Sequence, residues 1–218
     1  AGVAGFLAYT GQDSKVKKAA DAAAMRVLGL DSHGKATGKP DFGAVAPEFV
    51  SVALDTAVRD KGAPVFDAAY ENFKNAPNPF VRNTMLGAMT STTDPALVKR
   101  LRDMVFEPGA LRQNEIASVL FSQFGRPETR DSAWQWFQDN YDQITKVLPE
   151  GLVSRMPGLA GVFCSDAKAE EVKAFFKDKM AGHPGSERVL AQAMESAHLC
   201  ATRRAAQSPS AAKFFSRF

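Results

Sequence analysis

The feature that most constrains the fold is a helical phrase that returns three times along the chain. It opens at Asp94, Glu128 and Asp166, where the sequence reads TDPALVKRLRDMVF, RPETRDSAWQWFQD and SDAKAEEVKAFFKD. The starts lie roughly 34 to 38 residues apart, which is the length of one helix–turn–helix unit. A single unit of this kind cannot bury its own apolar face, so successive units stack on one another. The spacing predicts an all-α superhelix of antiparallel helix pairs, and an irregular helical bundle without a true repeat is the alternative.

Capping residues indicate where these helices begin. Asp94 can accept hydrogen bonds from the free amides of a first helical turn, and Pro95 suits the first helical position because its missing N–H is not needed there. Ser208 and Pro209 carry a similar signal, which predicts that a short final helix starts after them. No run shows the alternation with period two that a strand requires, so we expect no sheet.

Two aromatic residues of the second phrase point to the core. Trp134 and Phe137 are three positions apart and share one helix face, whereas Trp136 points elsewhere. A binding groove is the alternative use of such a cluster, but the shared face favours core packing.

Composition and charge limit the classes of partner. The formal net charge is +3 over 218 residues, which is too small to indicate binding to nucleic acid or to an anionic membrane. No apolar run approaches the roughly 20 residues that a membrane span requires. The chain starts with AGVAGFLAYT, which is apolar and lacks both Met and a basic leader. We therefore expect a piece of a longer protein without a signal peptide.

Residues that carry catalytic or metal chemistry are sparse. The chain has three His, and His33 and His183 lie in Gly-rich turns. Glu195 and His198 have a spacing that occurs in carboxylate metal sites of helix bundles, but the second such pair that these sites need is missing from the sequence. No His-Glu-x-x-His sequence, phosphate loop or nucleophile elbow occurs. We expect no catalytic residue, no metal ligand and no cofactor in this chain.

Cys164 and Cys200 are the two cysteines. On adjacent helices they would form one disulfide, and two buried thiols are the equally acceptable alternative. The cellular compartment stays open for the same reason.

Several short phrases follow one another in a characteristic order. In chain order they are Ala46-Pro47 with Val52-x-x-Asp55-x-Ala57, Gly62-x-x-x-Phe66-Asp67-x-x-Tyr70, Phe80-Val81-Arg82 with Leu86-x-Ala88-Met89, Asp94-Pro95-Ala96-Leu97, Leu111-Arg112-Gln113-Asn114, Trp134-x-x-x-x-Asp139-Asn140-Tyr141-Asp142, Val172-Lys173-x-Phe175-Phe176 and Arg188-x-Leu190-x-Gln192-Ala193-x-Glu195. Over residues 1–217 they resemble the C-terminal helical domain of zinc aminopeptidases of the puromycin-sensitive and endoplasmic-reticulum type and their bacterial relatives. Two positions depart from the pattern: Phe49 and Val50 stand where the family usually has an Arg, and Asn114 stands where it usually has Asp.

The resemblance implies a HEAT-like superhelix whose helix pairs close over a separate catalytic domain. Residues 1–218 would be one helical-repeat domain, the C-terminal part of an aminopeptidase whose catalytic domain, with its zinc, is absent from this chain. The chain itself would not be an enzyme. It would shape the access of peptides to the active site, with its own catalytic domain and peptide substrates as partners.

The resemblance also suggests where a peptide is held. Arg82 and Arg112 match family phrases, and we expect them as candidate contacts with a peptide carboxylate. The alternative function is a free-standing helical-repeat scaffold that binds a protein segment in its concave face. A nucleic-acid-binding repeat is disfavoured by the small net charge.

Overall fold

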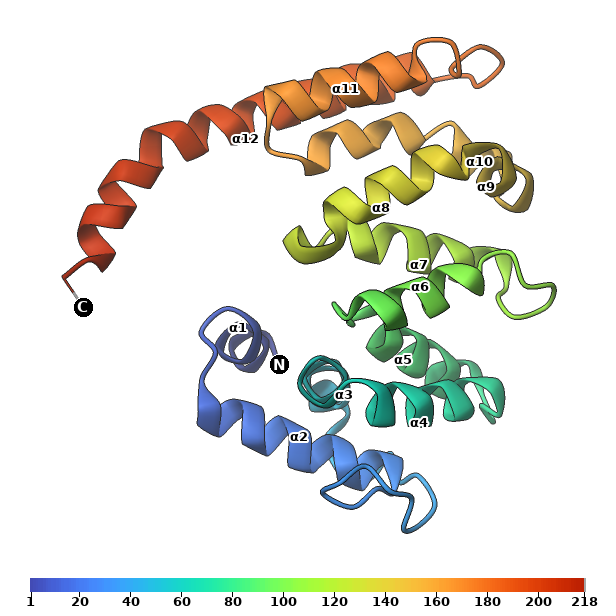
Figure 1. Ribbon diagram of the computed structural model, residues 1–218, viewed down its shortest axis with the longest axis vertical. Coiled ribbons are helices and arrows are strands. Elements are labelled where there is room, and N and C mark those ends of the chain that lie inside the picture. The colour runs from blue at the N-terminus through green and yellow to red at the C-terminus, as the bar shows by residue number, and fades with distance from the viewer. Residues whose placement is uncertain (218) are drawn as a thin grey trace. The chain divides into compact units, whose positions relative to one another are not determined.

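The computed structural model describes residues 1–217, and its regular structure is helical (Figure 1). The helices are α1 (Gly2–Tyr9), α2 (Ser14–Leu28), α3 (Pro47–Lys61), α4 (Ala63–Lys74), α5 (Pro79–Thr90), α6 (Pro95–Asp103), α7 (Gln113–Phe124), α8 (Pro127–Asp139), α9 (Tyr141–Val147), α10 (Glu150–Val153), the 3₁₀ helix η1 (Met156–Val162), α11 (Asp166–Phe176) and α12 (Ser186–Phe215). The described part of the chain has no strand, only an isolated bridge between Leu30 and Ala36. The prediction of an all-α helical-repeat fold is confirmed.

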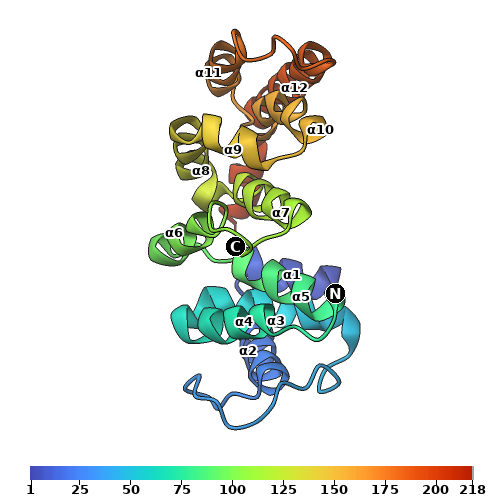
Figure 2. The same cartoon turned by 90° about the vertical axis from the view of Figure 1, so that its right-hand side faces the viewer.

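Contacts divide the chain into two compact units, residues 1–129 and residues 130–218. In the first unit α2 packs on α3, α4 on α5, and α5 on α7. In the second unit α12 packs on η1 and on α11 (Figure 1, Figure 2). The expectation that residues 1–218 form a single domain of a longer protein stays a prediction.

The repeated phrase begins helices as expected. Asp94 accepts hydrogen bonds from the amides of Ala96 and Leu97 at 2.8 and 3.1 Å and so caps α6. Glu128 lies in the first turn of α8, and Asp166 is the first residue of α11. Each phrase therefore marks the start of a helix.

The core of the second unit is aromatic. Trp134 and Phe137 are each 1% exposed, which confirms the prediction of core packing. Their rings stack with centroids 5.8 Å apart, and the Trp134 indole N–H donates a hydrogen bond of 2.6 Å to Glu171 Oε1. The buried ring thus keeps a partner for its polar atom. Phe176 closes the cluster from α11 and is also 1% exposed.

The predicted helix start at Ser208 and Pro209 is wrong. Helix α12 runs without a break from Ser186 to Phe215 with Pro209 inside it, and Figure 1 shows it curving along its second half. The Ser208 hydroxyl does not cap a new helix; it donates back to the Arg204 carbonyl at 2.6 Å. Proline removes one backbone hydrogen bond and bends a helix, and this stretch of α12 is exposed.

Cys164 and Cys200 form a disulfide with their Cα atoms 4.9 Å apart. Of the two alternatives that the sequence left open, one disulfide or two buried thiols, the structure shows the disulfide. It joins the turn that precedes α11 to helix α12, across a sequence separation of 36 residues. Among the described helices none is both long enough and apolar enough to span a membrane.

Candidate functional site

Arg82, the first predicted peptide contact, lies at the junction of α4, α5 and α7. Its guanidinium forms a bidentate pair with Glu115 at 2.6 and 2.9 Å and donates to the Ala110 and Phe73 carbonyls at 3.0 and 3.4 Å. It also stacks over the Phe73 ring, with 3.9 Å from Cζ to the ring centroid. The Arg82 side chain is 16% exposed, so most of its hydrogen-bonding capacity is directed into the protein.

Arg112, the second predicted contact, is held by the same acid. It is the N-cap residue of α7, and its backbone amide donates to Glu115 Oε2 at 2.8 Å. This is the reciprocal half of a capping box, in which the third helical residue reaches back to the cap. The Arg112 side chain is exposed. The structure therefore brings both predicted arginines to one carboxylate, with the Arg112 side chain exposed and the Arg82 side chain mostly buried.

Glu115 is the residue that sequence analysis missed. Its side chain is 1% exposed. Burial alone would raise its pKa, but the hydrogen bonds from Arg82 and from the Arg112 amide, together with the two positive charges, outweigh burial, and the net pKa is lowered. The Arg-x-x-Glu spacing at the start of a helix was the available signal, since it places an acid where a capping box needs one.

A recess of about 250 Å³ opens beside Arg82. It is bounded by the Tyr70 and Phe73 rings, by Lys74, and by the turn 107–110. Lys74 lies over the Tyr70 ring, with 4.7 Å from Nζ to the centroid, and a hydrogen bond with Glu71 raises its pKa. The recess combines aromatic walls with Lys74 and Arg82, whose charges are paired with Glu71 and Glu115, and with the acidic Glu107 in the turn.

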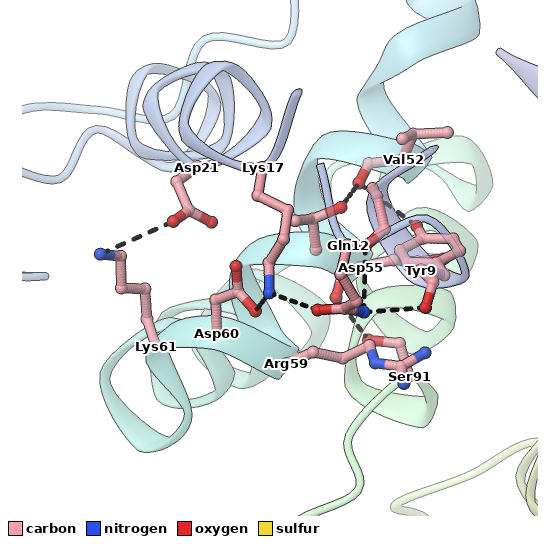
Figure 3. Close-up of polar contacts among 12 residues, drawn as sticks. Tyr9, Gln12, Lys17, Asp21, Val52, Asp55, Arg59, Asp60, Lys61 and Ser91 are labelled. Carbon is pink, nitrogen blue, oxygen red and sulfur yellow. Dashed lines mark hydrogen bonds and ion pairs between the residues drawn. The ribbon is translucent and has the colours of Figure 1, made fainter. Parts of the chain in front are cut away.

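A second polar cluster joins α1, α3 and α5 (Figure 3). The Tyr9 hydroxyl donates to the Val52 carbonyl at 3.3 Å, and the Ser91 hydroxyl donates to the backbone carbonyl of Asp55 at 3.1 Å. Burial raises the pKa of the Asp55 carboxyl to about 6, and the Arg126 charge, a hydrogen bond with Tyr9 and the Arg59 charge offset part of that rise. Burial and the Asp55 charge raise the pKa of Tyr9 to about 12.

Ion pairs link α2 to α3 beside this cluster (Figure 3). Lys17 Nζ lies 2.9 Å from Asp60 Oδ1, and Lys61 Nζ lies 3.6 Å from Asp21 Oδ2. Burial and the neighbouring Asp60 charge raise the pKa of Asp21. The ion pairs run between two adjacent helices, which indicates a structural role for these charges.

Two of the three histidines, His183 and His198, each pair with one carboxylate. His183 Nδ1 lies 2.5 Å from Glu150, and His198 Nδ1 lies 3.1 Å from Asp166. Among the described residues, no group of three His, Cys, Asp or Glu side chains is arranged to hold a metal ion.

Comparison with known proteins identifies the family of the chain. A sequence profile described as the ERAP1-like C-terminal domain matches residues 3–199. The chain belongs to the ERAP1-like C-terminal domain family. The resemblance read from the short phrases is thereby confirmed. Residues 200–218 follow the last residue that the profile matches.

The relatives of this ERAP1-like C-terminal domain are aminopeptidases of plants and yeasts. It is 24% identical over 141 residues to aminopeptidase M1-D of Oryza sativa subsp. japonica, a match that covers 62% of this chain and 15% of the relative. It is 27% identical over 120 residues to aminopeptidase M1 of Arabidopsis thaliana, covering 54% of the chain and 13% of the relative. It is 26% identical over 151 residues to aminopeptidase 2, mitochondrial, of Saccharomyces cerevisiae, covering 66% and 15%. The chain thus spans about 15% of the length of these relatives, and a bacterial origin stays a prediction.

Proposed function

We propose that this chain is a non-catalytic C-terminal domain of a zinc aminopeptidase, which closes over the active site and shapes the access of peptides. The observation that carries the proposal is the family match over residues 3–199, together with relatives that are aminopeptidases of which this chain spans a small part. The zinc and the groups that hold the substrate amine would belong to the rest of the parent protein. The chain contributes a helical surface that a peptide meets beyond the reacting bond.

The two arginines take different roles in this proposal. Arg112 presents an exposed guanidinium, so it is the contact for the carboxylate of a long peptide. Arg82 already binds Glu115 and two carbonyls, so it is a positioning residue that fixes Glu115 and through it the Arg112 backbone. An arginine paired inside a helix junction stitches neighbouring turns together more readily than it binds a ligand.

The test uses the parent enzyme and substrates of different length. A dipeptide-sized reporter reaches only the catalytic part, whereas a longer peptide also meets the helical surface. In Arg112→Gln we expect kcat/KM for the long peptide to fall roughly five-fold, the value of one exposed charge pair of about 1 kcal/mol. The short reporter should be unaffected. The same long peptide with an amidated C-terminus should not distinguish the variant from the parent.

Arg155→Gln is the matched control, since Arg155 is an exposed arginine of the second unit. Removal of the whole domain, or its addition in trans, extends the comparison. Equal losses for short and long substrates would mean that the domain only stabilises its neighbour, which contradicts the proposal. Aminopeptidase activity or tightly held zinc in the isolated chain would contradict the non-catalytic assignment.

A further inference from the structure

The positive charge of the protein is concentrated at its C-terminal end. Residues 199–217, here called the C-terminal arm, contain Arg203, Arg204, Lys213 and Arg217 and no acidic residue. The whole chain has 27 Lys and Arg against 24 Asp and Glu. The rest of the chain has 23 basic and 24 acidic residues, which gives a formal net charge of −1. The four basic residues of the arm therefore account for the net charge of +3.

The C-terminal arm leaves the packed part of the second unit. Helix α12 packs on η1 and α11 through Leu190, Ala193 and Ala197, and the Cys164–Cys200 disulfide fixes it there. Beyond the disulfide, residues 202–217 are all exposed. The family match ends at residue 199, the first residue of the arm, so the rest of the arm follows the shared part of the fold.

The arm carries large apolar side chains in this exposed stretch. Leu199, Phe214 and Phe215 are 58%, 54% and 70% exposed, and the two Phe rings meet edge to face with centroids 5.3 Å apart. Exposed aromatic side chains next to basic side chains indicate that the arm binds a partner which offers both apolar and anionic groups.

The helix of the arm would be stabilised by packing against a partner surface. A helical segment of this length whose residues are all exposed is marginal in water, because the cost of ordering it is offset mainly by packing. Pro209 lies in its middle and removes a further backbone hydrogen bond. We therefore expect the arm to fray in water and to become fully helical when it is bound.

The spacing of the side chains distinguishes between two kinds of surface. At about 100° per residue, Arg203, Arg204, Phe214 and Phe215 fall on one half of the helix, opposite the small residues Ala201, Ala205, Pro209 and Ala212. A helix that inserts into a protein groove needs apolar anchors at i, i+3 or i+4, and i+7, and the arm has two adjacent Phe instead. A membrane interface requires only basic groups at the phosphates and aromatic rings at the headgroup level.

We propose that the C-terminal arm binds a membrane surface rich in anionic phospholipid and lies along it as a peripheral contact. Arg203 and Arg204 meet the lipid phosphates, and Phe214 and Phe215, on the same half of the helix, insert at the headgroup boundary. The small net charge of the whole chain does not reveal this affinity for an anionic membrane, because acidic residues outside the arm balance the basic residues there. The proposal does not depend on the proposed peptidase role.

The test is cosedimentation of the full chain with vesicles of phosphatidylcholine alone and of phosphatidylcholine mixed with phosphatidylglycerol. We expect binding to the anionic vesicles only, weakened by salt, with a gain in helical circular dichroism. Arg203→Gln with Arg204→Gln should lower the partition coefficient about 30-fold, since each basic residue near the surface contributes about five-fold. Phe214→Ala with Phe215→Ala should also weaken binding.

Lys15→Gln with Lys18→Gln is the matched control, because it removes the same charge from exposed positions of α2 and should leave binding unchanged. All substituted positions are exposed, and thermal melts verify that each variant is folded. Equal binding to neutral vesicles, no binding to either, or full binding by the double Arg variant would overturn the proposal. A concentration-dependent dimer in sedimentation analysis that disappears on removal of the arm, without vesicle binding, would identify a second copy as the partner instead.

Discussion

Glu115 is the residue on which the predicted arginines depend. Its carboxylate accepts from Arg82 and from the Arg112 amide while it is almost fully buried. Glu115→Gln leaves the Arg82 guanidinium without its charged partner, and loss of one member of a buried pair costs about 3–5 kcal/mol. Because Arg82 keeps some contact with solvent, we expect a loss of about 2–4 kcal/mol in the free energy of unfolding, measured with urea at neutral pH.

The pH dependence of that loss follows from the lowered pKa of Glu115. A carboxyl whose folded pKa is depressed stabilises the fold above its unfolded pKa, and this stabilisation is lost as the pH falls through the folded value. The difference between parent and Glu115→Gln should therefore shrink in acid below about pH 4.5. Glu71→Gln, an exposed acid paired with Lys74, is the control and should change stability little.

Asp55 should behave in the opposite sense. Its folded pKa is raised from 3.8 to about 6, so the folded state binds a proton more tightly than the unfolded state. Stability is therefore highest below pH 3.8 with respect to this group and falls as the pH rises to about 6. Asp55→Asn should stabilise the protein at pH 8 by about 1–3 kcal/mol, and the gain should vanish near pH 4. Urea unfolding across this pH range measures it, and an unchanged or lowered stability at pH 8 would show that the carboxylate is required by its arginine neighbours.

At the residue scale, the sequence predicted what depends on local spacing. Trp134 and Phe137 share a helix face, and the cap at Asp94 needs only the next three residues, so both were predicted correctly. The buried Glu115 and the partly buried Asp55 were not, because the environment of such a charge depends on partners that the fold brings from distant positions. Arg82 lies 33 residues from Glu115 in the sequence.

At the scale of elements, the Cys164–Cys200 disulfide is the covalent link between α12 and the turn before α11. It closes a loop of 36 residues in sequence separation and fixes α12 against the turn before α11. Chain-entropy arguments assign a loop of this size about 3–4 kcal/mol. Cys164→Ser with Cys200→Ser should therefore lower the melting temperature of the second unit, and a reductant should do the same to the parent but not to the variant. A parent that melts identically with and without reductant would show that the bond is not formed in solution.

Element boundaries were predictable where a cap and a breaker agree. Asp94 caps α6 and Pro95 is its first residue, as expected, whereas the end of this helix at Asp103 carries no such local signal. Ser208 with Pro209 gave the same signal and failed, because that Ser binds back to the preceding turn. A local signal does not tell whether the helix already formed upstream will continue through it.

At the scale of the whole molecule, the repeat spacing predicted the helix pairs but not the division at residue 129. A repeat period describes how each helix contacts its neighbour in sequence. It carries no information on where such contacts become sparse. The boundary falls inside α8, a helix that local patterns present as one uninterrupted element.

The two units can be observed separately because both tryptophans of the chain, Trp134 and Trp136, lie in the second one. Tryptophan fluorescence therefore reports the second unit, whereas far-ultraviolet circular dichroism reports both. If the units unfold independently, Cys164→Ser with Cys200→Ser should move the fluorescence midpoint to lower urea and give a circular dichroism curve with two steps. Glu115→Gln, which lies in the first unit, should give the reverse: an early loss of helix with the fluorescence midpoint unchanged. Coincident transitions in both variants would mean that residues 1–218 unfold as one cooperative domain, because destabilisation of either unit would then be shared by the whole chain.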